Sequence, residues 1–223
     1  WVGRFEQALG LGGGCGRGTL GVDCGVSLAV AGGAGWRMVG RLEAAGEMVR
    51  ATLDNLGGRL DDATRVELWF QSALASHAQR DLDAAAAQYE QVLELGPAGD
   101  DALTQGRVLA NLGAVAHDRG ELDDAERWYE RALAALGGNQ RSLGAVRANL
   151  ALLQQERGDL VLAEASFQRA LVDLDAASAR HLASIHQSNL GTLRLELNEA
   201  EAACALHDQA LPHLRRMGDQ RST

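Results

Sequence analysis

The 223-residue sequence contains no lysine, two prolines and three cysteines. Without lysine the chain cannot contain a phosphate-binding loop of the GxxxxGKS or GxxxxGKT type, a Schiff-base lysine or the ATP-binding lysine of a protein kinase. The cysteines, Cys15, Cys24 and Cys204, have neither zinc-ligand nor redox spacing, and their small number fits a reducing compartment better than a disulfide framework. We therefore expect a cytoplasmic protein without a bound metal or cofactor.

Long apolar stretches are missing too. The longest, residues 26–36, has 11 residues, whereas a membrane-spanning helix needs about 20. The net charge is −9, with 30 acidic and 21 basic side chains, and such a balance disfavours binding to a phosphate backbone. We expect neither a membrane nor a nucleic acid among the partners.

Alanine is abundant, with 39 residues, and together with the scarcity of proline it favours long helices. The sequence also repeats itself every 38 to 40 residues. Ala-Asn-Leu-Gly at 110–113 returns as Ala-Asn-Leu-Ala at 148–151 and as Ser-Asn-Leu-Gly at 188–191. A turn sequence follows each copy, and apolar residues recur between turns at helical spacing. Each period therefore predicts two antiparallel helices.

A second phrase lies in the second half of each period, where a small residue is followed four positions later by a ring. The pairs are Ala85 and Tyr89, Ala125 and Tyr129, Ala163 and Phe167, and Ala203 and His207. With Trp69, Ala73 and Pro97, these phrases resemble the tetratricopeptide repeat, in the longer form of kinesin-light-chain-like proteins and large bacterial regulators. The resemblance implies an all-α fold, a right-handed α-solenoid of stacked antiparallel helix pairs.

The period sets the expected boundaries. We place a degenerate repeat at 26–58 and clear repeats at 60–98, 100–138, 140–175 and 177–217, with the start of a further turn at 218–223. Residues 1–25 are an irregular glycine-rich segment, in which residues 1–9 match the tail of an upstream repeat. Alternating residues at 22–30 leave two interpretations of this region, a loop with a short strand or a decayed repeat.

Small residues, rings and acids have expected structural roles. We expect Gly113, Ala151 and Gly191 to let the paired helices approach closely by facing alanines of the second helix, and the rings to fill the space between stacked repeats. Asp81 and Asp159 precede second helices, where a side-chain oxygen can cap the backbone.

Three asparagines, Asn111, Asn149 and Asn189, stand two positions before the small residue of their repeats, and Gln71 holds this place one repeat earlier. In the family that the sequence resembles, first helices line a concave groove, and asparagines here form a ladder that binds the backbone of an extended peptide. One amide offers a donor and an acceptor, which suits a peptide unit. The resemblance thus implies a protein or peptide partner. The alternative is that these amides only pack or bond between helices.

Further groove-lining candidates lie beyond the ladder. His77 and His117 occupy equivalent positions, and Gln155 continues their row. Acids come directly after this row, among them Glu156 and Glu196, and they favour a basic or neutral peptide. The alternative for the two histidines is a solvated helix face.

No catalytic set is recognisable. The match to GxGxxG at 16–21 lacks a preceding strand and lies in a glycine-saturated region. A self-contained enzyme that uses this segment would bind a nucleotide, which we do not expect. The sequence favours a non-catalytic scaffold. The alternative is the C-terminal sensor or regulatory arm of a larger bacterial signalling ATPase, transcriptional regulator or Ser/Thr kinase, whose catalytic domain lies outside this chain. The start at Trp1 and the absence of a polar capping helix suggest such a larger protein.

Overall fold

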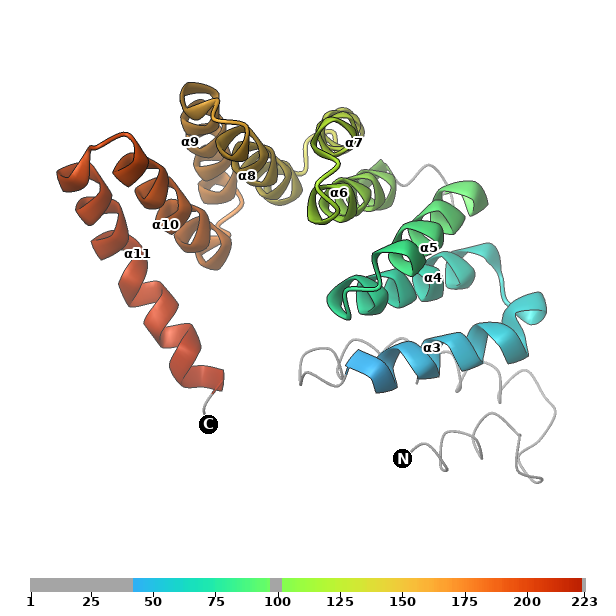
Figure 1. Ribbon diagram of the computed structural model, residues 1–223. Coiled ribbons are helices and arrows are strands. Elements are labelled where there is room, and N and C mark those ends of the chain that lie inside the picture. Colours follow the sequence, from blue (N-terminus) through green and yellow to red (C-terminus); the bar gives the residue numbers. More distant parts are fainter. Residues whose placement is uncertain (1–41, 97–101, 222–223) are drawn as a thin grey trace. The chain divides into compact units, whose positions relative to one another are not determined.

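The alanine-rich, proline-poor segments form helices joined by short turns, as Figure 1 shows for the computed structural model. The structure describes residues 42–96 and 102–221. Every regular element within these ranges is a helix, and the expected all-α fold of stacked antiparallel helix pairs is confirmed. The glycine-rich segment, the alternating residues 22–30 and Pro97 lie outside the described residues.

The chain divides into two units, residues 1–104 and 105–223. The first contains α3 (Leu42–Leu56), the 3-10 turn η1 (Gly57–Arg59), α4 (Asp62–Ala78) and α5 (Leu82–Leu95). Helix α4 packs against both α3 and α5. In the core the buried rings of Phe70 and Tyr89 meet edge to face, with centroids 5.9 Å apart. At the start of α4, the carboxylate of Asp61 accepts a hydrogen bond from the backbone N–H of Thr64 at 2.7 Å, which lowers the pKa of Asp61.

The second unit contains six helices, of which the first begins just before the boundary. They are α6 (Ala102–Asp118), α7 (Leu122–Ala135), α8 (Gln140–Glu156), α9 (Leu160–Ala176), α10 (Arg180–Glu196) and α11 (Ala200–Arg221). They form three antiparallel pairs. Neighbouring pairs stack through their adjoining helices, α7 on α8 and α9 on α10. We call α6, α8 and α10 the first helices and α7, α9 and α11 the second helices. Figure 1 shows these pairs.

One turn geometry joins the two helices of every pair. The backbone N–H three residues past the helix end donates to the carbonyl five residues earlier, as from Glu121 to Ala116 and from Asp159 to Gln154, both at 2.9 Å. This is the Schellman motif, whose central residue takes a left-handed conformation. Gly120 and Gly158 supply it with φ of 78° and 85°. A sequence-local rule therefore fixes the hairpin.

The capping prediction is right at one aspartate and wrong at the other. Asp81 accepts from the backbone N–H of Ala84 at 3.2 Å, but Asp159 makes no side-chain capping bond. The ψ of Asp159 is 58°, further from the extended conformation that an N-cap residue takes. The Schellman hydrogen bonds hold the backbone there without help from the carboxylate.

The small residues let paired helices approach closely, as expected, but their neighbours are larger than the alanines predicted. A Cβ built at Gly113 would lie 2.6 Å from the ring of Tyr129, and one at Gly191 would lie 2.9 Å from the ring of His207. These two rings therefore pack within their own pair. Phe167 lies in a buried cluster that spans α8, α9 and α10, so the expectation of a ring between stacked pairs is confirmed at this position.

Two glycines of the first helices mark a second close approach. A Cβ built at Gly106 would lie 2.6 Å from Leu136, just past the end of α7, and one at Gly144 would lie 2.6 Å from Leu174 of α9. Interiors are close-packed, so each large leucine requires a residue without a side chain on the facing helix. The equivalent position of the first unit lacks this contact, because nothing lies within 4 Å of a Cβ built at Gly96.

The expected turn at 218–223 is wrong for residues 218–221, because α11 continues to Arg221. A glycine within a helix costs only about 1 kcal/mol relative to alanine and does not end the helix by itself. No helix of the described part of the chain is long and apolar enough to cross a membrane.

Candidate functional site

The three asparagines of the predicted ladder lie on consecutive first helices. Asn111 is on α6, Asn149 on α8 and Asn189 on α10, and all three are partly exposed. The small residue two positions later packs against the second helix, at Gly113 and at Gly191. Two helical residues differ by about 200° around the axis, so the asparagines face away from the second helices.

Their amide groups are unoccupied. Within the described part of the chain, the side chains of Asn111, Asn149 and Asn189 make no hydrogen bond, and their polar atoms are not buried. A primary amide carries two donor hydrogens and an acceptor oxygen. The three side chains therefore offer identical hydrogen-bonding groups, at one register, to a molecule outside the protein.

Gln71 differs from these three residues. It occupies the same register on α4, in the first unit, but its amide nitrogen donates to Glu67 Oε1 at 2.5 Å. Its own Oε1 is buried without a hydrogen bond among the described residues. The longer side chain bonds back to its own helix, so Gln71 does not present a free amide as the three asparagines do.

Two further rows lie on the same face of the first helices. A row three residues after the ladder holds Ala114, Leu152 and Thr192, and we call it the middle row. A row seven residues after the ladder, the acid row, holds Asp118, Glu156 and Glu196. Spacings of three and seven residues keep side chains on one helix face, about 4.5 and 10.5 Å along the axis. Each first helix thus presents an amide, a small or apolar side chain and a carboxylate, in that order.

The lower-ranked candidates of the sequence analysis come together in pairs across stacked helices. His117 Nε2 lies 3.0 Å from Glu156 Oε2, an ion-pair distance without hydrogen-bond geometry. Gln155 donates from Nε2 to Glu196 Oε1 at 2.6 Å. The same register position thus contacts the acid row of the next pair twice. His77 lies on α4 of the first unit, partly exposed.

Arginines near the acid row point toward the second helices. Arg157 pairs with Glu126 at 2.5 Å and with Asp123 at 2.6 Å, both on α7. Arg194 pairs with Glu164 on α9 at 2.5 Å, and with Glu199. These contacts direct the positive charges away from the acid row.

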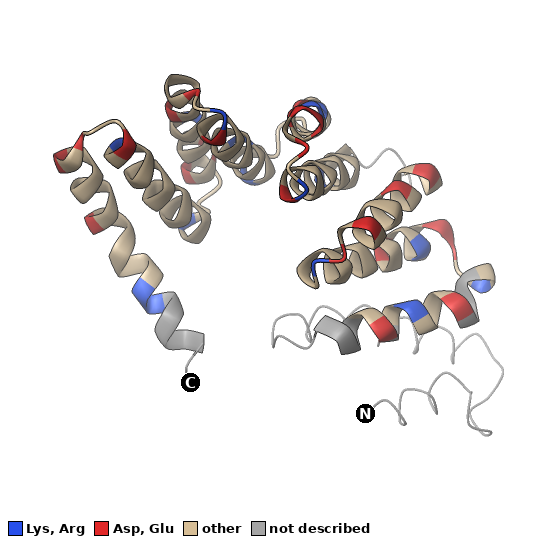
Figure 2. Cartoon of the chain, in the orientation of Figure 1, with Lys and Arg blue, Asp and Glu red and all other residues tan. Residues whose placement is uncertain are grey.

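The negative charges of the acid row change the pKa of a buried side chain. Burial raises the pKa of the Tyr129 hydroxyl above its ordinary value, and the negative charges of Asp118 and Glu156 raise it further. Figure 2 shows that acidic residues gather near the turns and helix ends.

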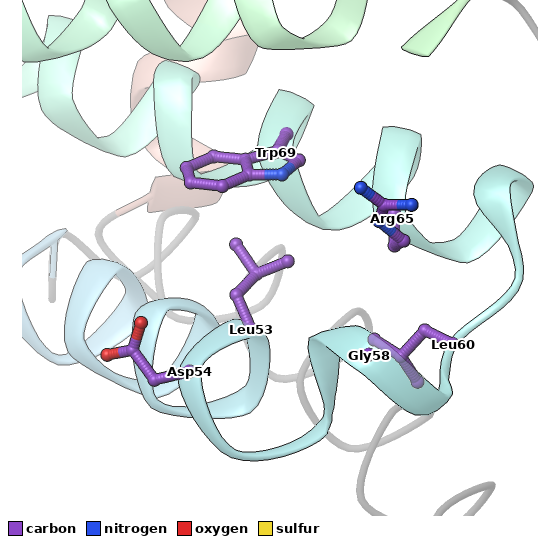
Figure 3. Close-up of a pocket in the computed structure, with 6 residues that line it drawn as sticks. All are labelled: Leu53, Asp54, Gly58, Leu60, Arg65 and Trp69. Atoms are coloured by element: carbon purple, nitrogen blue, oxygen red, sulfur yellow. The ribbon is translucent and has the colours of Figure 1, made fainter.

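The first unit has a pocket of its own, which sequence reasoning missed. Its volume is about 310 Å³, and Figure 3 shows Leu53 pointing toward the indole of Trp69 across it. Arg65 stands at its edge and pairs with Asp62 at 3.0 Å. The pocket depends on the 3-10 turn between α3 and α4, and no sequence pattern predicts this turn. Among the described residues, no group of three or more His, Cys, Asp and Glu side chains is placed to hold a metal ion.

Comparison with known families finds repeats over both units. A family model described as a tetratricopeptide repeat matches residues 104–176, and another of the same description matches residues 66–98. No curated protein is significantly similar in sequence.

Solved structures share the fold at low identity. BtubC (BKLC) from P. vanneervenii is 19% identical with a TM-score of 0.73, over 97% of this chain and 89% of that one. A Rap protein complexed with competence and sporulation factor is 14% identical with a TM-score of 0.78, over 88% of this chain and 56% of that one. A putative kinesin light chain of Podosopora anserina with nearly identical TPR-like repeats is 14% identical with a TM-score of 0.66, over 87% of this chain and 98% of that one. At such identities the likeness concerns the fold alone.

Proposed function

Because the chain is a tetratricopeptide-repeat protein, we propose that it is a non-catalytic scaffold that binds an extended peptide or partner segment along its first helices. The observation that carries this proposal is the set of three unoccupied amides at one register, on Asn111, Asn149 and Asn189. Asparagine is poorly suited to helix interiors, yet it recurs here on three helices in succession.

The amides suit a backbone ligand. In an extended segment the N–H and C=O groups of the backbone are unpaired, and a primary amide can accept from one and donate to the other. This recognition does not depend on the ligand's side chains. A Rap protein of similar fold has been solved in complex with competence and sporulation factor, which supports a binding role for this architecture.

The expected strength follows from the number of contacts. A hydrogen bond contributes a net ~0.5–1.5 kcal/mol, so a single amide adds little. Three amides acting on one ligand would contribute a few kcal/mol together. Single substitutions in the ladder should therefore weaken binding modestly, and the triple substitution strongly.

A pull-down from lysate tests the proposal. Wild type is compared with the Asn111→Ala/Asn149→Ala/Asn189→Ala variant, after circular dichroism has shown equal helicity. The Gln168→Ala/Gln209→Ala variant is the control, since it removes exposed amides from the second helices α9 and α11. We expect the control and wild type to capture the same partner and the triple variant to lose it. Capture by all three proteins would contradict the ladder.

The alternative remains a regulatory arm of a larger bacterial signalling protein, acting in the cytoplasm. It predicts that this chain alone captures nothing, whereas the full-length protein contains an adjoining catalytic domain. Sequencing the complete open reading frame distinguishes the two functions.

A further inference from the structure

The joints between the stacked pairs of the second unit are built from two recurring polar contacts. In the first contact, a histidine or glutamine of a first helix meets an acid of the next pair, as in His117–Glu156 at 3.0 Å and Gln155–Glu196 at 2.6 Å. In the second contact, a glutamate of a second helix pairs with an arginine of the next pair, as in Glu126–Arg157 and Glu164–Arg194, both at 2.5 Å. Each pair thus receives the next one through the same two positions.

The pair α10–α11 has no polar group of this kind at either position. One period after Gln155 and Glu164 the sequence has Leu195 and Cys204. We call Leu195, Cys204 and Leu211 the end face. Leu195 is 50% exposed and Leu211 is 39% exposed, and Cys204 is exposed as well. Gln155 and Glu164 are half-buried, so the end face is more open than the surface to which it corresponds.

The end face continues a surface that already holds a helix. Leu171, one period before Leu211, packs against the buried cluster to which α10 contributes Leu190 and Leu193. The surface that Leu171 belongs to therefore contacts a helix with two leucines three residues apart, which is the spacing of one helix face. By this equivalence, the end face suits an amphipathic helix that packs as a first helix does.

The end face does not suit the first helices of this chain. Their acid-row carboxylates would lie against Leu195, and burying a charge without a partner is unfavourable. The arginine of a joint would meet Cys204 instead of a glutamate. Helix α4 ends at Ala78 and has no acid in this row, but it already packs against α3. These mismatches disfavour a second copy of the chain as the occupant.

We propose that the end face binds an amphipathic helix of a partner protein, with uncharged or apolar residues in place of Arg194 and Glu196 of α10. This helix packs on Leu195, Cys204 and Leu211 as α10 packs on the preceding pair. The inference uses none of the ladder asparagines, so it stands apart from the proposed function.

Fluorescence anisotropy with two labelled peptides tests it. One peptide has the sequence of residues 180–197, and the other has the same sequence with Arg194→Gln and Glu196→Leu. Their equal length gives them a similar cost of helix formation, so the ratio of their affinities reports the contact with the end face. We expect the second peptide, the uncharged probe, to bind about tenfold more tightly than the first.

Two variants of the protein locate the binding. Leu195→Gln/Leu211→Gln should weaken the uncharged probe by about tenfold, because it removes apolar surface that the helix would cover. The matched control is Val161→Gln/Val172→Gln, which makes the same kind of change on α9, where Val161 is 80% and Val172 is 70% exposed. It should leave the affinity nearly unchanged. Circular dichroism first shows that both variants are as helical as wild type.

Several results would overturn the inference. Equal binding of the two peptides, or equal weakening by the end-face variant and its control, would indicate general apolar attraction, and no binding of the uncharged probe would leave the end face without its ligand. Loss of the probe in the triple asparagine variant would place it at the ladder instead. Self-association of the chain in sedimentation equilibrium, abolished by the end-face variant, would make a second copy the occupant. If the protein made from the complete open reading frame failed to bind the probe, its own polypeptide would fill the end face.

Discussion

Gly144 tests the packing of a helix pair most sharply. A Cβ built there would lie 2.6 Å from Leu174 Cγ and 2.9 Å from the backbone oxygen of Ala170. Leu174 is fully buried, and a backbone oxygen cannot rotate away, so α8 and α9 must separate to admit a methyl group. Overpacking costs about 1–3 kcal/mol, and contact with a backbone oxygen that cannot move aside places Gly144→Ala in the upper part of this range, at about 2–3 kcal/mol. The better helix propensity of alanine returns about 1 kcal/mol. We expect Gly144→Ala to lower the free energy of unfolding by about 1–2 kcal/mol.

Urea unfolding followed by circular dichroism measures this change, and a thermal melt should show a Tm lower by about 3–6 °C. Gly138→Ala is the matched control, because nothing lies within 4 Å of a Cβ built at Gly138 and its φ is not positive. The control should be as stable as wild type or slightly more stable. A Gly144→Ala variant as stable as wild type would refute the close approach of α8 and α9.

Two further predictions concern a buried histidine and the helix caps. Burial lowers the pKa of His186, which is 8% exposed; the folded state then resists protonation, so stability should be full above the ordinary pKa of about 6.5 and fall as the pH drops below it. Thermal melts between about pH 7 and pH 5.5 measure this effect. The His186→Val variant should have a higher Tm than the control His213→Gln, and its Tm should change less with pH. Equal pH dependence of the Tm in the two variants would contradict the prediction. Asn139 accepts from a backbone N–H at 3.0 Å, so Asn139→Ala should cost about 1 kcal/mol, whereas Asp159→Ala should cost little because its carboxylate caps nothing. If urea unfolding showed equal losses of stability in the two variants, the difference between the capping contacts of Asn139 and Asp159 would be wrong.

The helix pairs could be predicted because their causes are local. Each pair has a turn residue in the left-handed conformation, apolar residues at helical spacing and small residues at the crossing, and these features repeat with the period. The turn residue is glycine or asparagine in the second unit, and Arg80 takes this conformation between α4 and α5. The common register of Asn111, Asn149 and Asn189 on three first helices could be predicted for the same reason, since stacking places equivalent residues in a row. Their binding to a ligand stays a proposal.

Side-chain geometry was harder to predict. The sequence placed Gln71 in the ladder, but a side chain one carbon longer reaches Glu67 on its own helix. It also left open what His117 and Gln155 contact, because their partners lie 39 and 41 residues away. The pocket beneath Trp69 depends on the 3-10 turn η1, which has no sequence signature of its own.

The central claim is that the amides of three asparagines bind a ligand backbone, and proton–nitrogen NMR spectra of the asparagine side chains test it most directly. The amides of Asn111, Asn149 and Asn189 are assigned by single substitution and followed as a neutral synthetic peptide of four Gln-Ala-Ala repeats is added. The amides of Asn139, the N-cap residue of α8, and of Asn198, in the turn after α10, serve as internal controls. The account predicts that the three ladder signals shift together and saturate with the binding curve while the two controls stay in place. Ladder signals that do not move, while backbone signals elsewhere respond to the peptide, would contradict it.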